Sequence, residues 1–173
     1  MFRTILALVL IFTAQTGLAK GLTGTFPSID GGTLSIEDWR GRPVLVVNTA
    51  SQCAFTPQYD ALQKVYDRYR DRGLVVLAVP SDDFRQELDS AAEVKEFCEV
   101  NYDLDMPMTD ITHVTGAEAH PFFQAVKAEA GFEPAWNFNK ILIAPDGSVA
   151  GSWGSVTRPD GRVITKQIEA LLN

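Results

Sequence analysis

Two near-continuous apolar runs, Val44 to Asn48 and Leu74 to Val79, limit the folds open to this chain. Both are rich in β-branched residues, as is typical of strands buried on both faces of a sheet. The segment between them starts at Thr56-Pro57 and stops at Gly73. Thr can cap a helix, Pro is tolerated at its first position, and Gly often ends it. The pattern predicts a β-α-β unit.

The remaining segments extend this unit without a repeat, a linker or a low-complexity stretch. The last part of the chain predicts a strand, a tight turn, an antiparallel partner and a final helix. Together these elements indicate an α/β, thioredoxin-like fold that an N-terminal β-hairpin extends. The expected elements are a hairpin over 29–34, a helix after the capping box Ser90 to Glu93, a helix over 119–128, strands over 140–144 and 148–153, and a helix over 160–172.

The composition excludes several classes of protein. A chain of 173 residues with 46% hydrophobic and 21% charged residues is neither a disordered tail nor a multi-span membrane protein. Its two cysteines are too few for a disulfide-dense scaffold or a four-cysteine metal site. The net charge of −7 disfavours nucleic acid and anionic membranes as partners.

The N-terminus has the layout of a secretory signal peptide. Arg3 precedes a short apolar run, and Gly17-Leu18-Ala19 supplies the small residues that a signal peptidase requires. We therefore expect residues 1–19 to be a signal peptide and 20–173 the exported domain, periplasmic in a Gram-negative host and free of the membrane after cleavage. An uncleaved N-terminal anchor is the alternative.

Cys53 follows the first predicted strand and precedes the first predicted helix. Free N–H groups and the positive end of a helix dipole stabilise negative charge at such a position. No carboxylate lies between Asn48 and Tyr59, so nothing nearby in the sequence opposes ionisation. The position favours a reactive thiolate, and a small buried hydrophobic residue or half of a structural disulfide is the alternative.

Three blocks of sequence resemble the glutathione peroxidase family. Residues 46–59, which contain Cys53, resemble the family run V-N-x-A-S-x-C-G-x-T-x-x-Y, in which the cysteine is often selenocysteine. Residues 79–84 resemble the block F-P-C-N-Q-F, and residues 136–140 resemble W-N-F-x-K. The resemblance extends from about Leu34 to Leu172. It implies a thiol peroxidase that acts in the response to oxidative stress.

The resemblance implies a catalytic role for three residues. Cys53 would attack a hydroperoxide, release water or an alcohol, and become a sulfenic acid. Trp136 would offer its indole N–H and Asn137 its side-chain amide to the thiolate and the departing oxygen. Without the resemblance, Trp136 would be read as a residue that fills the core.

The second block departs from the family at the catalytic position. Asp83 stands where the family has a Gln that assists the reaction, so we keep Asp83 as a candidate catalytic residue. A carboxylate donates a hydrogen bond only when protonated, and its charge opposes a neighbouring thiolate. Asp83 would therefore point away, be protonated or slow the reaction, and Gln86 could substitute for it. Ser81 replaces the family's cysteine and cannot resolve a sulfenic acid.

Cys98 resembles the resolving cysteine of thioredoxin-dependent members of the family. It would form a disulfide with Cys53 that a thioredoxin-type dithiol then reduces. Its helix would have to unwind in part. Since Cys98 shares a helical stripe with Val94 and Phe97, a buried, inert residue is the alternative.

The partners and cofactors follow from the same residues. Only Lys140 and Arg85 offer cations near the three blocks, so we expect a thioredoxin-like reductant to outperform glutathione. The short segment between His120 and Trp136 resembles monomeric members. We expect no metal at His113 or His120 and no nucleotide cofactor. The alternatives are a non-enzymatic protein with a structural Cys53–Cys98 disulfide and a peroxide sensor.

Overall fold

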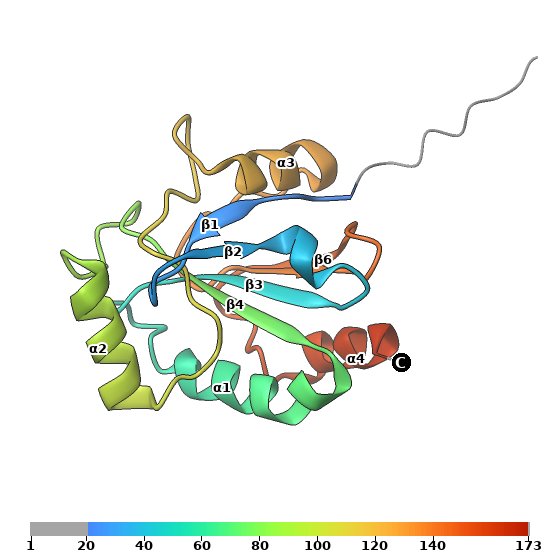
Figure 1. Cartoon of the computed structure of the whole chain (residues 1–173), viewed down its shortest axis with the longest axis horizontal. Helices are drawn as coiled ribbons and strands as arrows, with labels where there is room; N and C mark the ends of the chain where they lie inside the picture. Colours follow the sequence, from blue (N-terminus) through green and yellow to red (C-terminus); the bar gives the residue numbers. More distant parts are fainter. Residues whose placement is uncertain (1–20, 173) are drawn as a thin grey trace, which may run out of the picture.

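A four-stranded mixed sheet forms the centre of the molecule (Figure 1). The structure, a computed structural model, describes residues 21–172, so the expected signal peptide lies outside the described residues. The strand order is β4-β3-β5-β6, with β3 parallel to β4 and antiparallel to β5, and β5 antiparallel to β6. The strands are β3 (Val44–Thr49), β4 (Val75–Pro80), β5 (Lys140–Ile143) and β6 (Val149–Trp153).

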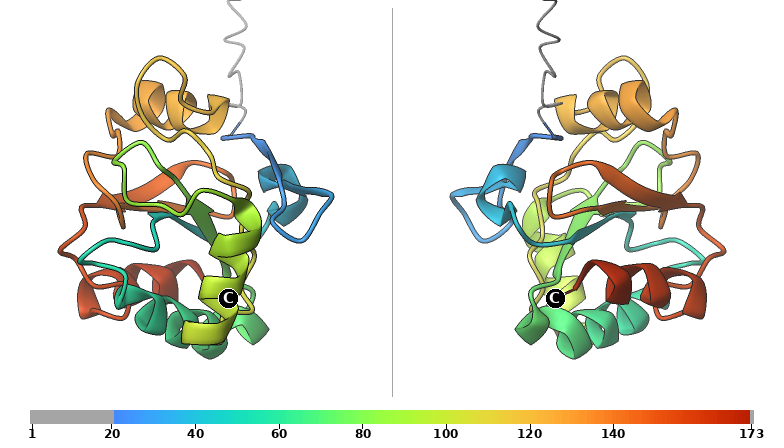
Figure 2. Two further views of the ribbon diagram at one scale, coloured as in Figure 1. Left: turned by 90° about the vertical axis from the view of Figure 1, so that its left-hand side faces the viewer. Right: turned by 90° about the vertical axis from the view of Figure 1, so that its right-hand side faces the viewer.

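Helices cover both faces of the sheet (Figures 1 and 2). One face carries α3, the opposite face carries α1 and α4, and α2 packs at the side of the molecule against the α1 layer. Side chains of β3 alternate between the two cores: Val44 and Val46 face the α3 layer, and Leu45 and Val47 face the α1 layer. The helices are α1 (Gln58–Tyr69), α2 (Ala91–Tyr102), α3 (Pro121–Ala130) and α4 (Arg162–Leu171), with short 3₁₀ turns at η1 (Ile36–Trp39) and η2 (Arg70–Arg72).

A small hairpin precedes this unit, as predicted. β1 (Thr25–Pro27) pairs antiparallel with β2 (Thr33–Ser35) across a turn that contains Gly31 and Gly32. Both glycines have positive φ, 88° and 76°, which a residue with a Cβ adopts only at a cost. The arrangement confirms the thioredoxin-like α/β fold with an N-terminal hairpin.

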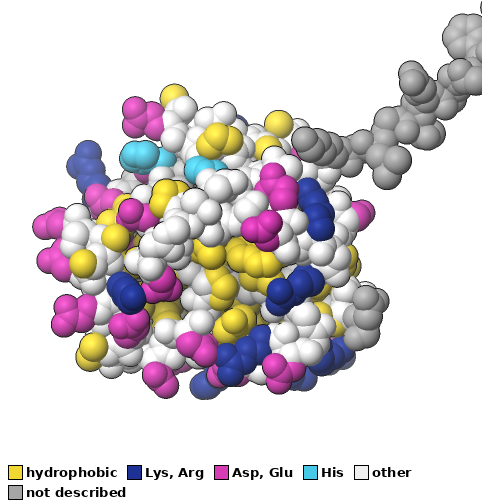
Figure 3. All heavy atoms as spheres, in the orientation of Figure 1, with side chains coloured by type: hydrophobic (Ala, Val, Ile, Leu, Met, Phe, Trp, Pro, Cys, Tyr) yellow, Lys and Arg dark blue, Asp and Glu magenta, His cyan; other side chains and the backbone are white. Residues whose placement is uncertain are grey.

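Two of the predicted helix signals lie where a helix begins or ends. Ser90 caps α2 by accepting a hydrogen bond from the N–H of Glu93, and Gly73 follows α1 and η2 in a left-handed conformation. Acidic side chains outnumber basic ones over α2 on the face that Figure 3 shows, in keeping with the net charge of −7. Between residues 21 and 172, none of the helices has the length and apolar character needed to cross a bilayer.

Candidate active site

The loop over 50–57 carries Cys53 from the end of β3 to the start of α1. Thr56 was expected to cap the helix, but α1 begins after Pro57 and no side chain caps it. The Thr56 hydroxyl closes the loop instead. Its Oγ1 accepts a hydrogen bond from the N–H of Cys53 (3.0 Å) and lies 2.9 Å from the carbonyl oxygen of Ala50. The loop is therefore fixed by its own side chain before the helix starts.

The sulfur of Cys53 lies in this loop with a hydrogen-bond donor pointed at it. The residue is 7% exposed, and the backbone N–H of Phe55 donates to Sγ across 3.4 Å. A series of turns then leads from Cys53 into α1 through the N–H groups of Thr56, Gln58 and Tyr59. These three N–H groups donate to the carbonyls of Cys53, Phe55 and Thr56, so the donor that the structure places at the sulfur is the N–H of Phe55, and the positive end of the α1 dipole adds to its effect. This geometry suits a nucleophilic sulfur.

The sequence around Cys53 contains no carboxylate, but the fold brings one to this loop from elsewhere in the chain. Oε1 of Glu87 accepts hydrogen bonds from the N–H groups of Ser51 and Leu88, both 2.9 Å. Burial raises the pKa of Glu87, and the hydrogen bonds lower it by less. Its Oε2 and the hydroxyl of Ser51 are buried without a hydrogen-bond partner among the described residues. Glu87 therefore positions the backbone two residues before the nucleophile.

A second loop, which contains the predicted donors, is tied to the end of β3 by Asn48. The side-chain Nδ2 of Asn48 donates to the carbonyl of Trp136 (3.0 Å), and its Oδ1 accepts from the N–H of Asn139 (3.0 Å). Its backbone carbonyl accepts from the N–H of Phe138 (2.6 Å). Phe138 has a φ of 59°, a strained conformation for a bulky residue. These contacts hold the strained turn beside the Cys53 loop.

The two predicted donors in this turn differ in exposure. Trp136 is 42% exposed and its ring lies 5.4 Å from that of Phe84, so it does not fill the core. Asn137 is fully buried, and its Nδ2 donates to Oε1 of Gln86 across 3.1 Å. The structure thus brings Asn137 and Gln86 together.

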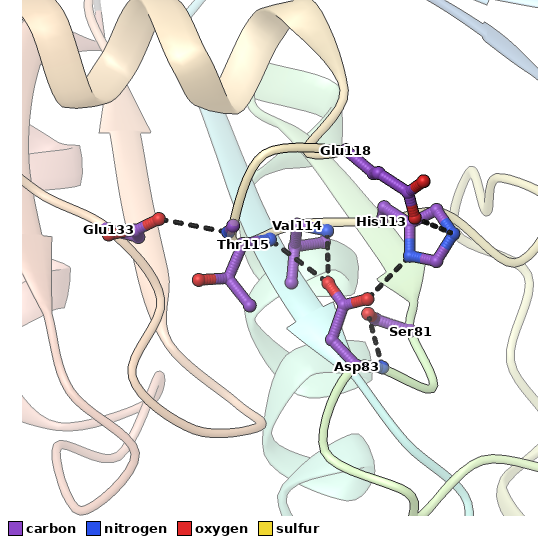
Figure 4. Close-up of polar contacts among 8 residues, drawn as sticks. Ser81, Asp83, His113, Val114, Thr115, Glu118 and Glu133 are labelled. Carbon is purple, nitrogen blue, oxygen red and sulfur yellow. Dashed lines mark hydrogen bonds and ion pairs between the residues drawn. The ribbon is translucent and has the colours of Figure 1, made fainter.

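Asp83 faces a different part of the molecule (Figure 4). Its Oδ1 lies 2.6 Å from Nδ1 of His113, and its Oδ2 accepts from the N–H groups of Val114 (2.6 Å) and Thr115 (3.0 Å). Burial raises the pKa of Asp83, but the hydrogen bonds from these three residues outweigh it and bring the pKa below its usual value. Both oxygens of the Asp83 carboxylate are therefore bound to the 113–115 segment.

Cys98 lies in the core on α2. It is 1% exposed, and no disulfide joins it to Cys53, since both thiols are free. Burial raises the pKa of Cys98 to about 12. A cleft of about 300 Å³ borders it, with Ile29, Met106 and Met108 among the lining residues. In this conformation Cys98 is a poor nucleophile.

Lys140 is a buried amine and not a surface ligand. It is 0% exposed at the start of β5, and its Nζ donates to Oε1 of Gln58 (2.6 Å) and to the carbonyl of Ser155 (3.2 Å). Burial lowers the pKa of Lys140 to about 7. The side chain therefore ties β5 to α1 and to the segment that follows β6.

The two histidines take part in structural contacts. His113 binds Asp83, and His120 lies 3.1 Å from the carbonyl of Thr25 through Nε2 while its Nδ1 accepts from the N–H of Phe122. Over residues 21–172, no three His, Cys, Asp or Glu side chains gather as metal ligands would.

Known proteins resemble this chain in sequence and in structure. A family model described as glutathione peroxidase matches residues 23–127. The chain is 40% identical over 156 residues to the hydroperoxy fatty acid reductase gpx1 of Synechocystis sp., and the match covers 84% of this chain and 91% of that protein. It is 36% identical over 148 residues to the glutathione peroxidase-like peroxiredoxin gpx1 of Schizosaccharomyces pombe, with 83% and 92% covered. The crystal structure of Trgpx in apo form matches with a TM-score of 0.67 and 30% identity, over 85% of this chain and 91% of that one.

Proposed function

Because this chain belongs to the glutathione peroxidase family, we propose that it is a thiol peroxidase in which Cys53 reduces hydrogen peroxide or organic hydroperoxides. The observation that carries the proposal is the placement of Cys53. Its sulfur lies in the loop that leads into α1 and accepts a hydrogen bond from a backbone N–H. Asn48, in the strand before this loop, also binds the turn that contains Trp136 and Asn137. The relative named a hydroperoxy fatty acid reductase supports lipid hydroperoxides as substrates.

The reaction follows from thiolate chemistry. The thiolate of Cys53 attacks the distal oxygen of the hydroperoxide, a new S–O bond forms, and the O–O bond breaks. The departing oxygen takes a proton and leaves as water or alcohol, and the sulfur becomes a sulfenic acid. Trp136 and Asn137 are neutral donors, which suits negative charge that moves from sulfur to oxygen. Trp136 is partly exposed, so a peroxide from solvent can reach its side chain.

Cys98 completes the cycle in this proposal. It attacks the sulfenic acid, water leaves, and a Cys53–Cys98 disulfide forms that a thioredoxin-like dithiol reduces. Two observations favour this reductant over glutathione. The relative in Schizosaccharomyces pombe is named a peroxiredoxin, and Lys140, one of two cations near the family blocks, is buried and cannot reach a glutathione carboxylate.

The proposal includes export and a monomeric state. The charge, apolar run and small residues of 1–19 support a signal peptide, and periplasmic location in a Gram-negative host. The N-terminal sequence of the mature protein, recovered from each cell fraction, tests cleavage after Ala19. The short segment between His120 and Trp136 supports a monomer, which light scattering of the purified protein tests.

The experiment that tests the activity is stoichiometric. The reduced protein receives one equivalent of hydrogen peroxide, free thiols are blocked within seconds, and both cysteines are mapped by mass spectrometry. The proposal predicts a Cys53–Cys98 disulfide in the wild type and a trapped Cys53 sulfenic acid in Cys98→Ser. Oxidation of Cys53 alone in the wild type would retain the peroxidase and remove Cys98 from the cycle. Two unreacted thiols would contradict the proposal.

A further inference from the structure

We propose that Gln86 supplies the side-chain amide that assists the reaction of Cys53, and that Asp83 acts only by positioning Gln86. This inference rests on the proposed peroxidase function and defines its donor set. The amide is thus supplied by Gln86, three positions after Asp83, the residue that aligns with the family's Gln.

Asp83 cannot supply this amide because its carboxylate is already engaged. One oxygen meets the imidazole of His113 and the other meets two backbone N–H groups of the same loop (Figure 4). These hydrogen bonds favour the ionised form, and an ionised carboxylate has no proton to donate. The side chain is therefore an anchor to the 113–115 loop.

The turn that follows Asp83 delivers Gln86 to the site. The N–H of Arg85 donates to the carbonyl of Asp82 (2.8 Å), and Arg85 has a φ of 56°, in the left-handed region. This reversal places Gln86 against the Cys53 loop, where its carbonyl accepts from the N–H of Gln52 (2.9 Å). The backbone of Gln86 is thus bound to the residue that precedes the nucleophile.

The side chain of Gln86 then meets Asn137. Its Oε1 accepts from Nδ2 of Asn137 across 3.1 Å. Each amide has two N–H bonds, so whichever of the two donates in this contact, three N–H bonds of the pair are left over. The described residues supply no acceptor for Nε2 of Gln86. The pair therefore holds unused donors beside the turn that the family resemblance assigns to catalysis.

Two attachments hold the turn in this position. At its start, Asp83 binds the 113–115 loop, and its own N–H donates to Oγ of Ser81 (3.3 Å). At its end, the N–H of Glu87 donates to Oδ1 of Asp82 (3.1 Å). Removal of the Asp83 carboxylate would release the first attachment and leave the second. Asp83 is in this account a positioning residue and Gln86 a catalytic one.

The test is the second-order rate constant for oxidation of Cys53 by hydrogen peroxide in a single turnover of the full chain. Gln86→Ala should lower it about 100-fold, the usual effect of removing one donor from an oxyanion site. Gln86→Glu keeps the acceptor oxygen and the size, loses the donor and adds a charge that opposes the thiolate, so it should lower the rate constant at least as much. Gln167→Ala, on the exposed side of α4, is the matched control and should leave the rate constant unchanged.

A double-mutant cycle separates positioning from general structural damage. Asp83→Ala should lower the rate constant in the wild type and have no further effect in Gln86→Ala. Rate constants within about twofold of the wild type in both Gln86 variants would overturn the inference. So would a full additional loss from Asp83→Ala in the Gln86→Ala background. If wild-type Cys53 reacts no faster than free cysteine, the proposed function itself fails, and that outcome is distinct from both.

Discussion

The side chain of Asn48 holds the carbonyl of Trp136 at 3.0 Å, although the two residues are 88 positions apart. Asn48 is the last residue but one of the central strand β3, just before the loop that carries Cys53. Its position is thus fixed by the sheet, and through it the turn with Trp136 and Asn137 is fixed as well. A strand of the core thus holds both the loop that carries Cys53 and the turn that carries the two proposed donors.

Asn48→Ala should weaken both the fold and the site. The variant leaves the buried N–H of Asn139 without its acceptor and the carbonyl of Trp136 with one donor fewer. The free energy of unfolding should fall by about 1–3 kcal/mol, the usual cost of an unsatisfied buried polar group. Denaturant unfolding measures this loss, and the time course of Cys53 oxidation by hydrogen peroxide in a single turnover measures the accompanying loss of rate. An unchanged rate at a reduced stability would show that the donors do not depend on this contact.

Oxidation should loosen α2. Cys98 is buried with a pKa raised to about 12, so only about one molecule in 10⁵ holds its thiolate at pH 7 in the reduced conformation. Attack on a Cys53 sulfenic acid therefore requires Cys98 to leave the core, and its helix to open. Hydrogen exchange over 91–102 should be faster in the Cys53–Cys98 disulfide form than in the reduced protein. The Cys98→Ser variant, treated with peroxide, is the control and should keep its protection. Equal exchange in the two wild-type forms would mean that the disulfide forms without opening of α2.

The Glu87→Gln variant should be more stable than the wild type, by an amount that grows as the pH rises. Burial raises the pKa of Glu87 above its usual value, so the folded state binds more protons than the unfolded state between the two values. The stability that protonation of Glu87 contributes is therefore present at low pH and is lost as the pH rises through the raised pKa. Gln keeps the acceptor oxygen for the N–H groups of Ser51 and Leu88 and carries no charge.

Thermal unfolding from pH 4 to 7 measures this effect as a gap between Glu87→Gln and the wild type that widens with pH. Glu87→Ala is the contrasting variant. It removes the acceptor and should cost about 1–3 kcal/mol, because it leaves buried N–H donors unsatisfied. A gap that narrows with pH would show that the charge of Glu87 stabilises the fold.

The sequence predicts the helices, strands and turns of this molecule better than it predicts the side-chain contacts between them. The apolar run of β3, the capping box at Ser90 and the turn at Gly31-Gly32 are local signals, and each lies where it was predicted. The contacts of Glu87 with Ser51 and of Asn48 with Trp136 join residues far apart in the sequence. The spacing of residues in the sequence does not predict these two contacts, because they depend on how loops from different strands meet at one edge of the sheet.

The position of Asp83 shows a further limit of prediction from the sequence. Its alignment with the family Gln places it in the site, but its partners come from the 113–115 loop, which the sequence reading left unassigned. A carboxylate that meets several N–H groups turns toward them, whatever its neighbours in the sequence do. The shortened turn in the sequence was enough to suggest Gln86 as a substitute for Asp83. Its contact with Asn137 could not be predicted without the fold.

Lys140→Met should remove a pH dependence of stability above neutrality. Burial lowers the pKa of Lys140 to about 7, well below its usual 10.5, so between these values the unfolded state binds the proton that the folded state has lost. The free energy of unfolding should therefore rise with pH in this range, by up to about 1.4 kcal/mol per pH unit.

Above pH 9 the raised pKa of Cys98 acts in the opposite direction, so the comparison is made between pH 7 and 8.5. Urea unfolding in this interval should show a smaller slope in Lys140→Met than in the wild type, while Lys166→Met, at an exposed position of α4, should keep the wild-type slope. Equal slopes in all three proteins would mean that Lys140 keeps its proton in the folded state.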